Sequence, residues 1–281
     1  MKKITIIFSI ICLLLILCGI YFYFENTTLE VSTYQIATNK IPNEFNNYKI
    51  IQISDFHNNT SSKLTKKIVE KIKNQKPNII VITGDLIDST KTNVDIAIDM
   101  IKEIIEIAPI YYVTGNHEAR TNEYDNLKSQ MIELGVKILE NEAQEIQLNN
   151  STINILGIND PSFYKESDIL DSKIVKNNME NIQYNEDNFT ILLSHRPEVF
   201  KIYVEKNIDL VFTGHAHGGQ IRLPFIGGII APNQGTFPEY TDGIYREKDT
   251  TMVVSRGIGN SIIPFRVNNR PELMIVELKS N

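Results

Sequence analysis

The 281-residue chain has only two cysteines and five histidines. Both cysteines, Cys12 and Cys18, lie in an apolar N-terminal run, so the remainder of the chain has none. This absence excludes a small secreted scaffold held by disulfides, and it removes soft thiolate ligands from any metal site. The chain also lacks a basic block and has a formal net charge of −6. We therefore expect no nucleic-acid partner.

One long run without charged residues is present at the N-terminus, where "MKK" precedes residues 4–24. As a helix this run would span about 31 Å, which is roughly the thickness of a bilayer core. It is longer than the apolar core of a typical signal peptide, and no small-residue cleavage site follows it. We expect an uncleaved transmembrane anchor, with a cleaved signal as the alternative. Lys2 and Lys3 then place the N-terminus in the cytoplasm and the remaining chain outside the cell membrane.

Strand-like and helix-like runs alternate along the rest of the chain. Apolar runs at 49–54, 78–83, 110–114, 189–194 and 208–213 indicate buried strands, and most of the intervening segments have helical periodicity. This alternation predicts an α/β fold with mostly parallel strands flanked by helices. Residues 220–277 are expected to be rich in strands. Within them, the apolar loop 224–240 would either fold over a sheet edge or form a lip that dips towards lipid.

Polar clusters follow five of these strand-like runs. Each run ends in Ser or Thr, and the residues that follow are Asp55-Phe56-His57, Gly84-Asp85-Leu86-Ile87-Asp88, Gly115-Asn116-His117-Glu118, His195, and Gly214-His215-Ala216-His217. All five histidines of the chain fall in these clusters. Because sites in open α/β sheets form outside the carboxyl ends of the strands, we expect the five clusters to converge on one site.

The residue types in the clusters indicate a metal centre. Imidazoles mixed with carboxylates and one amide suit ions such as Zn, Fe or Mn. In extended chain, residues i and i+2 point to the same side, so Asp55 and His57 can face one ion, and His215 and His217 can face one centre. The candidate ligands are too many for one tetrahedral zinc. Two ions that share a carboxylate would account for the excess.

Taken together, the pieces "DFH", "GDLID", "GNHE", the lone His195 in "LSHRPE", and "GHAH" resemble the calcineurin-like metallophosphoesterases, in the order of that family. The resemblance covers about residues 50–278. The N-terminal run and the tail segment 255–273 resemble its membrane-anchored bacterial branch, some members of which are similar to UDP-2,3-diacylglucosamine hydrolases. The implied fold is a sandwich of two mixed β-sheets flanked by α-helices, preceded here by one transmembrane helix.

This resemblance implies a division of the chain and a set of metal ligands. The expected parts are a cytoplasmic stub and anchor at 1–24, a tether and first strand at 25–48, and a catalytic domain at 49–281. The ligands implied for one ion are Asp55, His57, Asp85 and His217. The ligands implied for the other are Asp85, Asn116, His195 and His215. Asp85 would bridge the two ions.

Further residues receive roles from the same resemblance. His117 would face the phosphoryl group and the leaving oxygen without binding metal, and Asp88 would orient its ring. Glu118 is interpreted as a solvated residue that follows the motif. Because guanidinium forks match phosphate oxygens, Arg196 and Arg256 are candidates for contact with substrate, with an ordinary surface or structural arginine as the alternative. Weaker candidates for that contact are Arg222, Arg266 and Arg270.

The function expected from the sequence is that of a membrane-anchored phosphodiesterase or pyrophosphatase with two metal ions (Mn, Fe or Zn). A hydroxide bridging the ions would attack phosphorus in line. The substrate would be a phosphoester of the cell envelope, either lipid-linked or part of the wall. Two alternatives stay open: a wall-associated binding protein of the same fold without relevant catalysis, and a phosphatase acting on nucleotides or phosphoproteins. The residue types do not identify which of these metals is bound, and they do not predict an oligomeric state.

Overall fold

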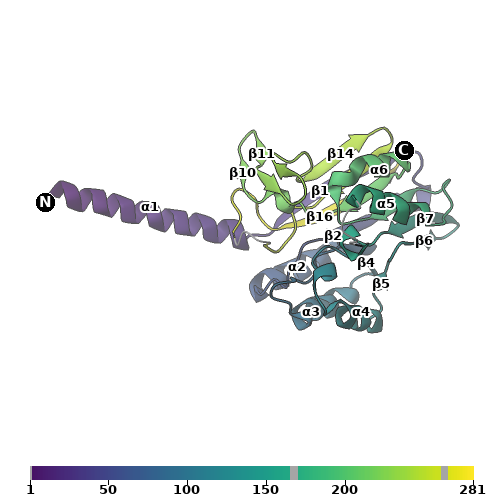
Figure 1. Ribbon diagram of the computed structural model, residues 1–281, viewed down its shortest axis with the longest axis horizontal. Coiled ribbons are helices and arrows are strands. Elements are labelled where there is room, and N and C mark those ends of the chain that lie inside the picture. Colours follow the sequence, from purple (N-terminus) through teal and green to yellow (C-terminus); the bar gives the residue numbers. More distant parts are fainter. Residues whose placement is uncertain (1, 165–169, 261–264) are drawn as a thin grey trace.

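A long N-terminal helix projects from a layered α/β body (Figure 1). The structure is a computed structural model that describes residues 2–164, 170–260 and 265–281; Met1 and four residues of the tail segment 255–273 lie outside these ranges. Helix α1 (Lys2–Thr27) contains an 18-residue window with a mean hydropathy of 2.8 and is the one described helix long and apolar enough to cross a membrane. It continues past the expected end at residue 24, so only Thr28 and Leu29 separate it from the first strand.

Two six-stranded mixed sheets form the body. The order of the first sheet is β1 (Glu30–Thr38), β16 (Glu272–Ser280), β2 (Lys49–Ile53), β3 (Ile79–Thr83), β4 (Ile110–Val113) and β5 (Lys137–Ile138). Strands β2 to β5 are parallel to one another, and β16 is antiparallel to β2. The N-terminal strand β1 pairs in parallel with the C-terminal strand β16, so both ends of the chain beyond α1 belong to one sheet.

The second sheet repeats the parallel arrangement in its centre. Its order is β14 (Gly243–Glu247), β15 (Thr250–Val254), β9 (Leu210–Thr213), β8 (Thr190–Leu193), β7 (Ser151–Gly157) and β6 (Glu142–Leu148). Strands β15, β9, β8 and β7 are parallel, and the edge strands β14 and β6 are antiparallel to their neighbours. The expected α/β fold with two mixed sheets is confirmed.

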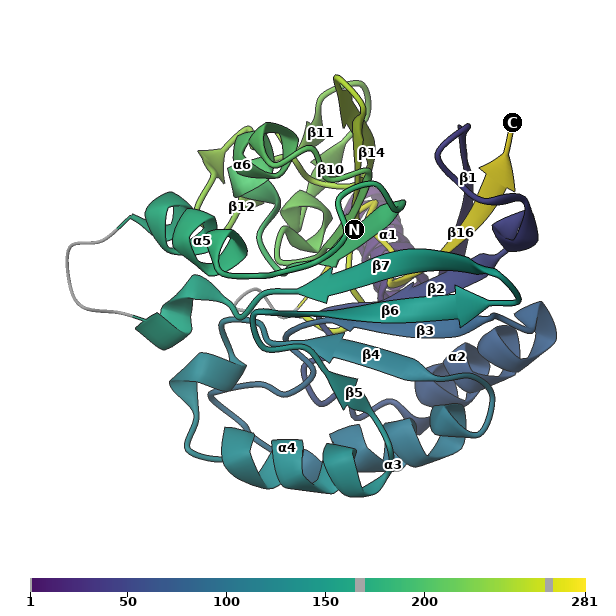
Figure 2. The ribbon, with the colours of Figure 1, turned by 90° about the vertical axis from the view of Figure 1, so that its right-hand side faces the viewer.

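The sheets pack face to face, and helices cover their outer faces (Figure 2). The core between the sheets joins residues such as Val81 and Val113 of the first sheet to Ile191 and Phe212 of the second. The helices on the first sheet are α2 (Ser62–Gln75), α3 (Val94–Ile105) and α4 (Tyr124–Glu133). The helices on the second are α5 (Asp171–Glu180) and α6 (Phe200–Glu205).

Local sequence explains these elements. Strand β3 is buried on both faces between the helices and the second sheet, which is why it is an unbroken apolar run. Helix α2 buries Leu64, Ile68 and Ile72, whose spacing of four places them on one stripe of the helix. The Ser61 hydroxyl accepts the N–H of Leu64 at 3.3 Å and caps the first turn.

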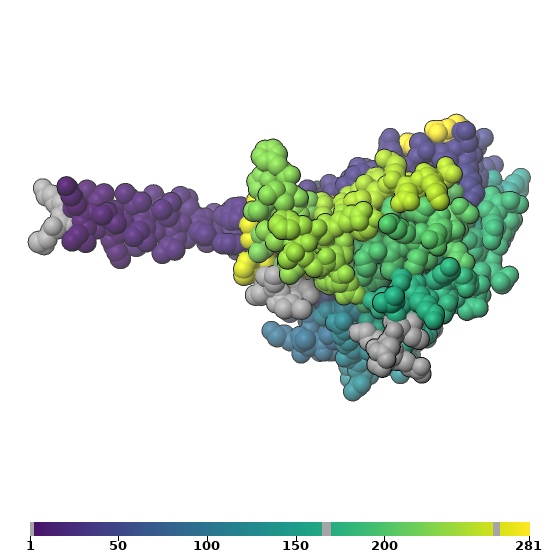
Figure 3. Space-filling view, turned by 45° about the horizontal axis from the view of Figure 1, so that its top comes forward, coloured from purple at the N-terminus to yellow at the C-terminus, as the bar shows by residue number. Residues whose placement is uncertain are grey.

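Short elements complete the chain. The single-turn helices are Asn43–Phe45, Glu118–Arg120, Pro161–Tyr164, Pro197–Val199 and His217–Gly219. Two small hairpins follow the last of these: β10 (Arg222–Leu223) with β11 (Gly227–Gly228), and β12 (Ile230–Ala231) with β13 (Gly235–Thr236). The expected strand-rich character beyond residue 220 is confirmed. The light green region that holds β10 and β11 protrudes beside the end of α1 (Figure 3).

Candidate metal centre

The polar clusters that follow β2, β3, β4, β8 and β9 meet at one end of the sandwich. All seven expected ligands are buried, with exposed fractions from 0% to 7%. Burial of so many ionisable side chains is unfavourable unless they pair or bind a metal. The structure therefore brings together the residues that the sequence predicted to converge.

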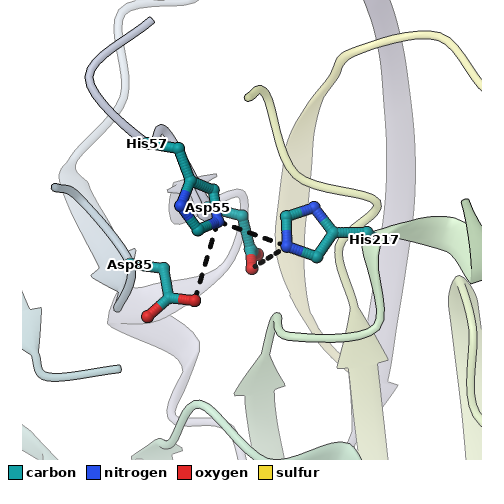
Figure 4. A group of neighbouring side chains, drawn as sticks. All are labelled: Asp55, His57, Asp85 and His217. Atoms are coloured by element: carbon teal, nitrogen blue, oxygen red, sulfur yellow. Dashed lines mark hydrogen bonds and ion pairs between the residues drawn. The ribbon is translucent and has the colours of Figure 1, made fainter. Parts of the chain in front are cut away.

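A first group contains Asp55, His57, Asp85 and His217, whose ligand atoms all lie within 4.8 Å of one another (Figure 4). Nε2 of His57 lies 3.2 Å from Nε2 of His217 and 3.6 Å from Oδ2 of Asp85. Nε2 of His217 lies 3.3 Å from Oδ1 of Asp55. Two nitrogens and two carboxylate oxygens thus face one small volume.

A second group contains Asp85, His195 and His215. Nε2 of His195 lies 3.2 Å from Oδ2 of Asp85 and 3.1 Å from Nδ1 of His215. Asn116 is also buried, and its Oδ1 has no hydrogen-bond partner among the described residues. Oδ2 of Asp85 approaches an imidazole nitrogen of each group, so a single carboxylate oxygen connects the two.

The donors fit metal ions. Each pair of facing imidazole nitrogens can share at most one proton, so their lone pairs converge with carboxylate oxygens. The unpartnered Oδ1 of Asn116 costs free energy in a buried position, and a cation would satisfy it. Nitrogen and oxygen ligands without sulfur suit Zn, Mn and Fe.

Hydrogen bonds and charges set the state of these ligands. Nδ1–H of His195 donates to the carbonyl oxygen of Thr83 at 2.7 Å, which points Nε2 towards Asp85. Burial lowers the pKa of His195, but the carboxylates of Asp85 and Asp55 outweigh it and raise the pKa to about 10. Burial opposes ionisation of Asp85 as well, yet His195 and the other histidines hold its pKa well below its usual range.

His215 and His217 respond differently from His195. Burial and nearby cationic groups hold the pKa of His215 and of His217 well below the usual value. Both are therefore neutral at pH 7, which is the form that binds metal.

The backbone at the ligands is strained. Five of the seven ligands have left-handed φ angles: Asp55 (51°), His57 (47°), Asp85 (51°), His215 (65°) and His217 (47°). Each such non-glycine residue costs of order 1–3 kcal/mol. Hydrogen bonds hold this geometry, since the Asp55 carboxylate accepts the N–H of His215 at 3.1 Å and the hydroxyl of Ser54 at 2.6 Å. Strain concentrated at these positions is typical of a functional site.

His117 lies beside the first group and is 8% exposed. Its Nδ1 accepts the backbone N–H of Ser89 at 3.0 Å, so in the neutral ring Nε2 carries the proton and lies 4.0 Å from Oδ2 of Asp85. Oδ2 of Asp88 is farther from that Nδ1, at 3.8 Å, and lies 3.5 Å from Nδ1 of His57. The expectation that Asp88 orients the His117 ring is thus corrected, because the Ser89 N–H is the nearer partner. Burial lowers the pKa of His117 to about 4.

Glu118 is a structural part of the site, contrary to its interpretation as a solvated residue. Its carboxylate is fully buried, with Oε2 accepting the N–H groups of Asp85 at 2.8 Å and Gly115 at 2.7 Å. Oε1 accepts the N–H of Ile87 at 3.2 Å. Burial and the neighbouring Asp85 raise the pKa of Glu118 to about 7. Only its place directly after "GNH" hinted at this role in the sequence.

Arg196 is buried and paired, which favours the alternative of a structural arginine over contact with substrate. Its Nε and Nη2 donate to both oxygens of Asp160 at 2.5 and 2.9 Å, and Nη1 lies 3.3 Å from Glu198. Nη1 also lies 3.2 Å from Nε2 of His215. Its fork is therefore engaged with carboxylates behind the metal ligands.

The other expected arginines also have protein partners. Arg256 pairs with Glu272 and Glu30, both at 3.0 Å, and is 7% exposed. The partners of the weaker candidates are Asp242 for Arg222, the carbonyl groups of Arg256 and Gly259 for Arg266, and Glu25 for Arg270. Most of these pairs are far apart in sequence, so composition around each arginine gave no sign of them.

A groove of about 830 Å³ opens beside the first group and was not foreseen from the sequence. Its lining includes His57 and Asp88 as well as Asn26, which lies in the last turn of α1. The rest of its lining is mainly neutral and polar: Asn58, Asn59, Thr60, Ser61, Thr90, Lys91, Asn93, Ile96, Gly259 and Asn260. The run of amide and hydroxyl residues directly after "DFH" is the one sequence signal that could have indicated this groove.

Comparisons with known proteins agree with this geometry. The family described as "Calcineurin-like phosphoesterase" matches residues 48–219. An uncharacterized metallophosphoesterase, YkuE of Bacillus subtilis, is 30% identical over 92% of this chain and 88% of its own length. Phosphodiesterase YaeI of Escherichia coli is 25% identical over 82% of each chain.

One further relative and one solved structure are also similar to this chain. A Bos taurus relative named as a transmembrane protein with a metallophosphoesterase domain is 29% identical over 86% of this chain and 55% of its own length. The crystal structure of TT1561 of Thermus thermophilus has the same fold, with a TM-score of 0.51 at 11% identity over 75% of this chain and 90% of that one. These matches show that the chain belongs to the calcineurin-like metallophosphoesterase family and is a metal-dependent phosphoester hydrolase.

Proposed function

We propose that the protein is a dinuclear phosphodiesterase or pyrophosphatase. One ion would be held by Asp55, His57, Asp85 and His217. The other would be held by Asp85, Asn116, His195 and His215. The observation that carries the proposal is the position of Asp85 Oδ2, which lies 3.6 Å from Nε2 of His57 and 3.2 Å from Nε2 of His195. A carboxylate oxygen between two sets of donors is the arrangement that a shared ligand requires.

Bound ions would supply Lewis acidity towards the phosphoryl oxygens and lower the pKa of a bound water. Residues of the chain would orient the substrate and donate hydrogen bonds to it. His117, held by the N–H of Ser89, keeps its proton on Nε2 and can donate a hydrogen bond from it to the phosphoryl group or the leaving oxygen. Asp88 accepts from the Thr90 N–H at 2.7 Å and from its hydroxyl at 2.6 Å, which fixes the carboxylate beside both His57 and His117. Positioning of this kind contributes through preorganisation.

The substrate class follows from the groove and from α1. A lining of amide and hydroxyl side chains suits a hydroxylated group attached to the scissile phosphate, and the lining includes Asn26 of the apolar helix α1. We therefore place the substrate at the cell membrane, as a lipid-linked or wall phosphoester. With Lys2 and Lys3 in the cytoplasm, α1 would cross the membrane once and leave the catalytic body outside. The names of the E. coli and Bos taurus relatives support the reaction and the membrane location.

Turnover of bis-(p-nitrophenyl) phosphate by the full chain, with added Mn²⁺ and a count of metal per chain, tests the proposal. We expect about two ions per chain and loss of both ions and turnover in Asp85→Asn. Bound metal without turnover of any phosphoester would favour the binding-protein alternative. A panel of lipid-linked diesters, nucleotides and phosphopeptides then separates an envelope phosphodiesterase from the soluble-substrate phosphatase.

A further inference from the structure

Residues 222–237 form an exposed apolar surface. Five large apolar side chains in this segment point to solvent: Leu223, Phe225, Ile226, Ile230 and Phe237. We call these five side chains the apolar rim. Phe225 is fully exposed, and Phe237 is 68% exposed. The one charged residue of the segment, Arg222, is paired with Asp242 at 2.8 Å. An exposed apolar patch with no free charge marks a site that contacts a membrane, another protein or a ligand.

The apolar rim begins beside α1. Figure 1 shows β10 and β11 on the side of the body from which α1 projects. Asn268 connects the two: its Oδ1 accepts the hydroxyl of Tyr21 in α1 at 2.8 Å, and its Nδ2 donates to the carbonyl oxygen of Arg222 at 3.1 Å. The backbone N–H of Asn268 also donates to the Tyr21 hydroxyl at 3.1 Å. One residue therefore places the start of the rim at the level of Tyr21 along the helix.

The junction between α1 and the body is fixed by further contacts. Glu25 is buried, and its carboxylate pairs with Nε of Arg270 at 2.9 Å and accepts the N–H of Asn269 at 3.1 Å. The Asn26 side chain exchanges two hydrogen bonds with the backbone of Arg266, at 2.8 and 3.2 Å. These bonds hold the helix in one direction relative to the body. The position of α1 in a membrane thus sets the position of the apolar rim.

The position of Tyr21 along α1 indicates which partner contacts the apolar rim. Tyrosine near the end of an apolar span lies at the membrane–water interface, because its ring is apolar and its hydroxyl seeks polar partners. We propose that the apolar rim lies in the outer interfacial layer of the same bilayer that α1 spans, with lipid as its partner. The inference rests on the proposed membrane anchoring. Side chains without free charge insert into this layer to a depth of roughly 5–10 Å.

The same contacts connect the rim to the metal centre. Nη1 of Arg222 donates to the carbonyl oxygen of Gly218 at 2.9 Å, and Nδ2 of Asn269 donates to the carbonyl oxygen of His217 at 2.7 Å. The loop that carries His217 is thus bonded both to Arg222, which directly precedes the rim, and to Asn269, which binds Glu25. Lipid contact at the rim therefore sets the height and tilt of the site above the bilayer, where headgroup-linked phosphoesters lie.

A fluorescence experiment on the full chain tests the rim directly. Since Cys12 and Cys18 are the only cysteines, the Cys12→Ser/Cys18→Ser chain accepts one new thiol for an environment-sensitive dye. Phe225→Cys reports on the rim. Ile132→Cys is the matched control, because Ile132 is also an exposed apolar residue but lies on α4. Leu15→Cys reports on α1. Each protein is reconstituted in vesicles of phosphatidylcholine and phosphatidylglycerol that contain either a shallow doxyl-lipid quencher, for the dyes at residues 132, 225 and 237, or a deep one, for the dye at Leu15→Cys.

We expect quenching at Phe225→Cys that is at least about twofold stronger than at Ile132→Cys, because only the rim enters the interfacial layer. Adding Ile226→Asp and Ile230→Asp should weaken quenching of a dye at Phe237→Cys, since charge opposes insertion. Quenching at Leu15→Cys without quenching at Phe225→Cys overturns the rim and leaves the anchor intact. Absence of quenching at both sites overturns the rim together with the anchor. A blue shift at Phe225→Cys without lipid quenching means that protein covers the rim, which also overturns the inference.

Discussion

The backbone N–H of Asp85 donates to Oε2 of Glu118 at 2.8 Å, so a buried carboxylate holds the main chain of the residue that connects both ligand groups. The same oxygen accepts the N–H of Gly115. Glu118 thus fixes the loops that follow β3 and β4 relative to each other. The position of Asp85 depends on a residue that contributes no atom to either ligand group.

Replacing Glu118 with Gln should loosen the metal centre. The amide has one acceptor oxygen instead of two, and its NH₂ group would face backbone N–H donors. A buried group left without a partner costs about 1–3 kcal/mol, so we expect the free energy of unfolding to fall by about that amount. Metal content per chain should fall with it. Urea unfolding and metal analysis measure both quantities.

Glu103→Gln on the exposed face of α3 is the control for this variant. If Glu118→Gln and Glu103→Gln both behave like the wild type, Glu118 does not hold the site.

Asp85 and His117 should give different results when replaced. Asp85→Asn removes the charge shared by the two ligand groups, so metal and turnover should be lost together. His117→Ala removes a group that we propose does not bind metal, so the metal should stay while kcat falls by about 10²–10⁴-fold. Metal analysis and kcat measured on the same samples separate the two effects. Loss of metal in His117→Ala as complete as in Asp85→Asn would show that the proposed roles are wrong.

The positions of the expected metal ligands were predictable because these residues lie in short clusters of the sequence. Each cluster directly follows a buried strand, and parallel strands bring their carboxyl ends to one edge. Glu118 was misinterpreted, and Arg196 and Arg256 kept two interpretations, because their partners are not local. Arg196, for example, pairs with Asp160, which lies 36 residues earlier in the chain. Residue type alone does not distinguish a substrate-binding arginine from a buried structural one.

The junction between α1 and the body was missed for the same reason. The apolar run predicted a helix that could span a membrane, and the polar residues after it were interpreted as a tether. Glu25 and Asn26 instead continue the helix and bond to residues about 240 positions later. Their partners emerge only once β1 pairs with β16 and brings the two ends of the chain together.

Gly115→Ala should disturb the metal centre more than the fold. A methyl group at this position would overlap the carboxylate and backbone N of Asp85. We expect metal content and turnover to fall because Asp85 must shift. Gly135→Ala is a useful contrast, since a methyl group there meets no atom within 4 Å but the left-handed backbone, with φ at 87°, is strained by a side chain. That variant should lose stability and keep its metal. Normal metal content in Gly115→Ala would contradict the proposed packing limit.

The Arg196–Asp160 pair should make stability depend on acid. Burial alone would raise the pKa of Asp160, but the Arg196 guanidinium and its hydrogen bonds hold the pKa below the usual range. A carboxyl with a lowered folded-state pKa stabilises the fold above its unfolded pKa of about 3.9, and this contribution is lost as the pH falls through the folded value. Breaking a buried pair costs about 3–5 kcal/mol, so Asp160→Asn should show that deficit at neutral pH.

Unfolding by urea at several pH values, with EDTA present so that metal release does not contribute, measures this difference. The gap in unfolding free energy between the wild type and Asp160→Asn should be constant above about pH 5 and should narrow below about pH 4, because the wild-type carboxyl is then protonated. Asp99→Asn provides the control, since Asp99 is exposed and pairs with Lys102 on the same helix turn, where such pairs contribute about 0.3–0.5 kcal/mol. A gap that stays unchanged down to pH 3 would mean that Asp160 stabilises the fold by packing and hydrogen bonding instead of by its charge.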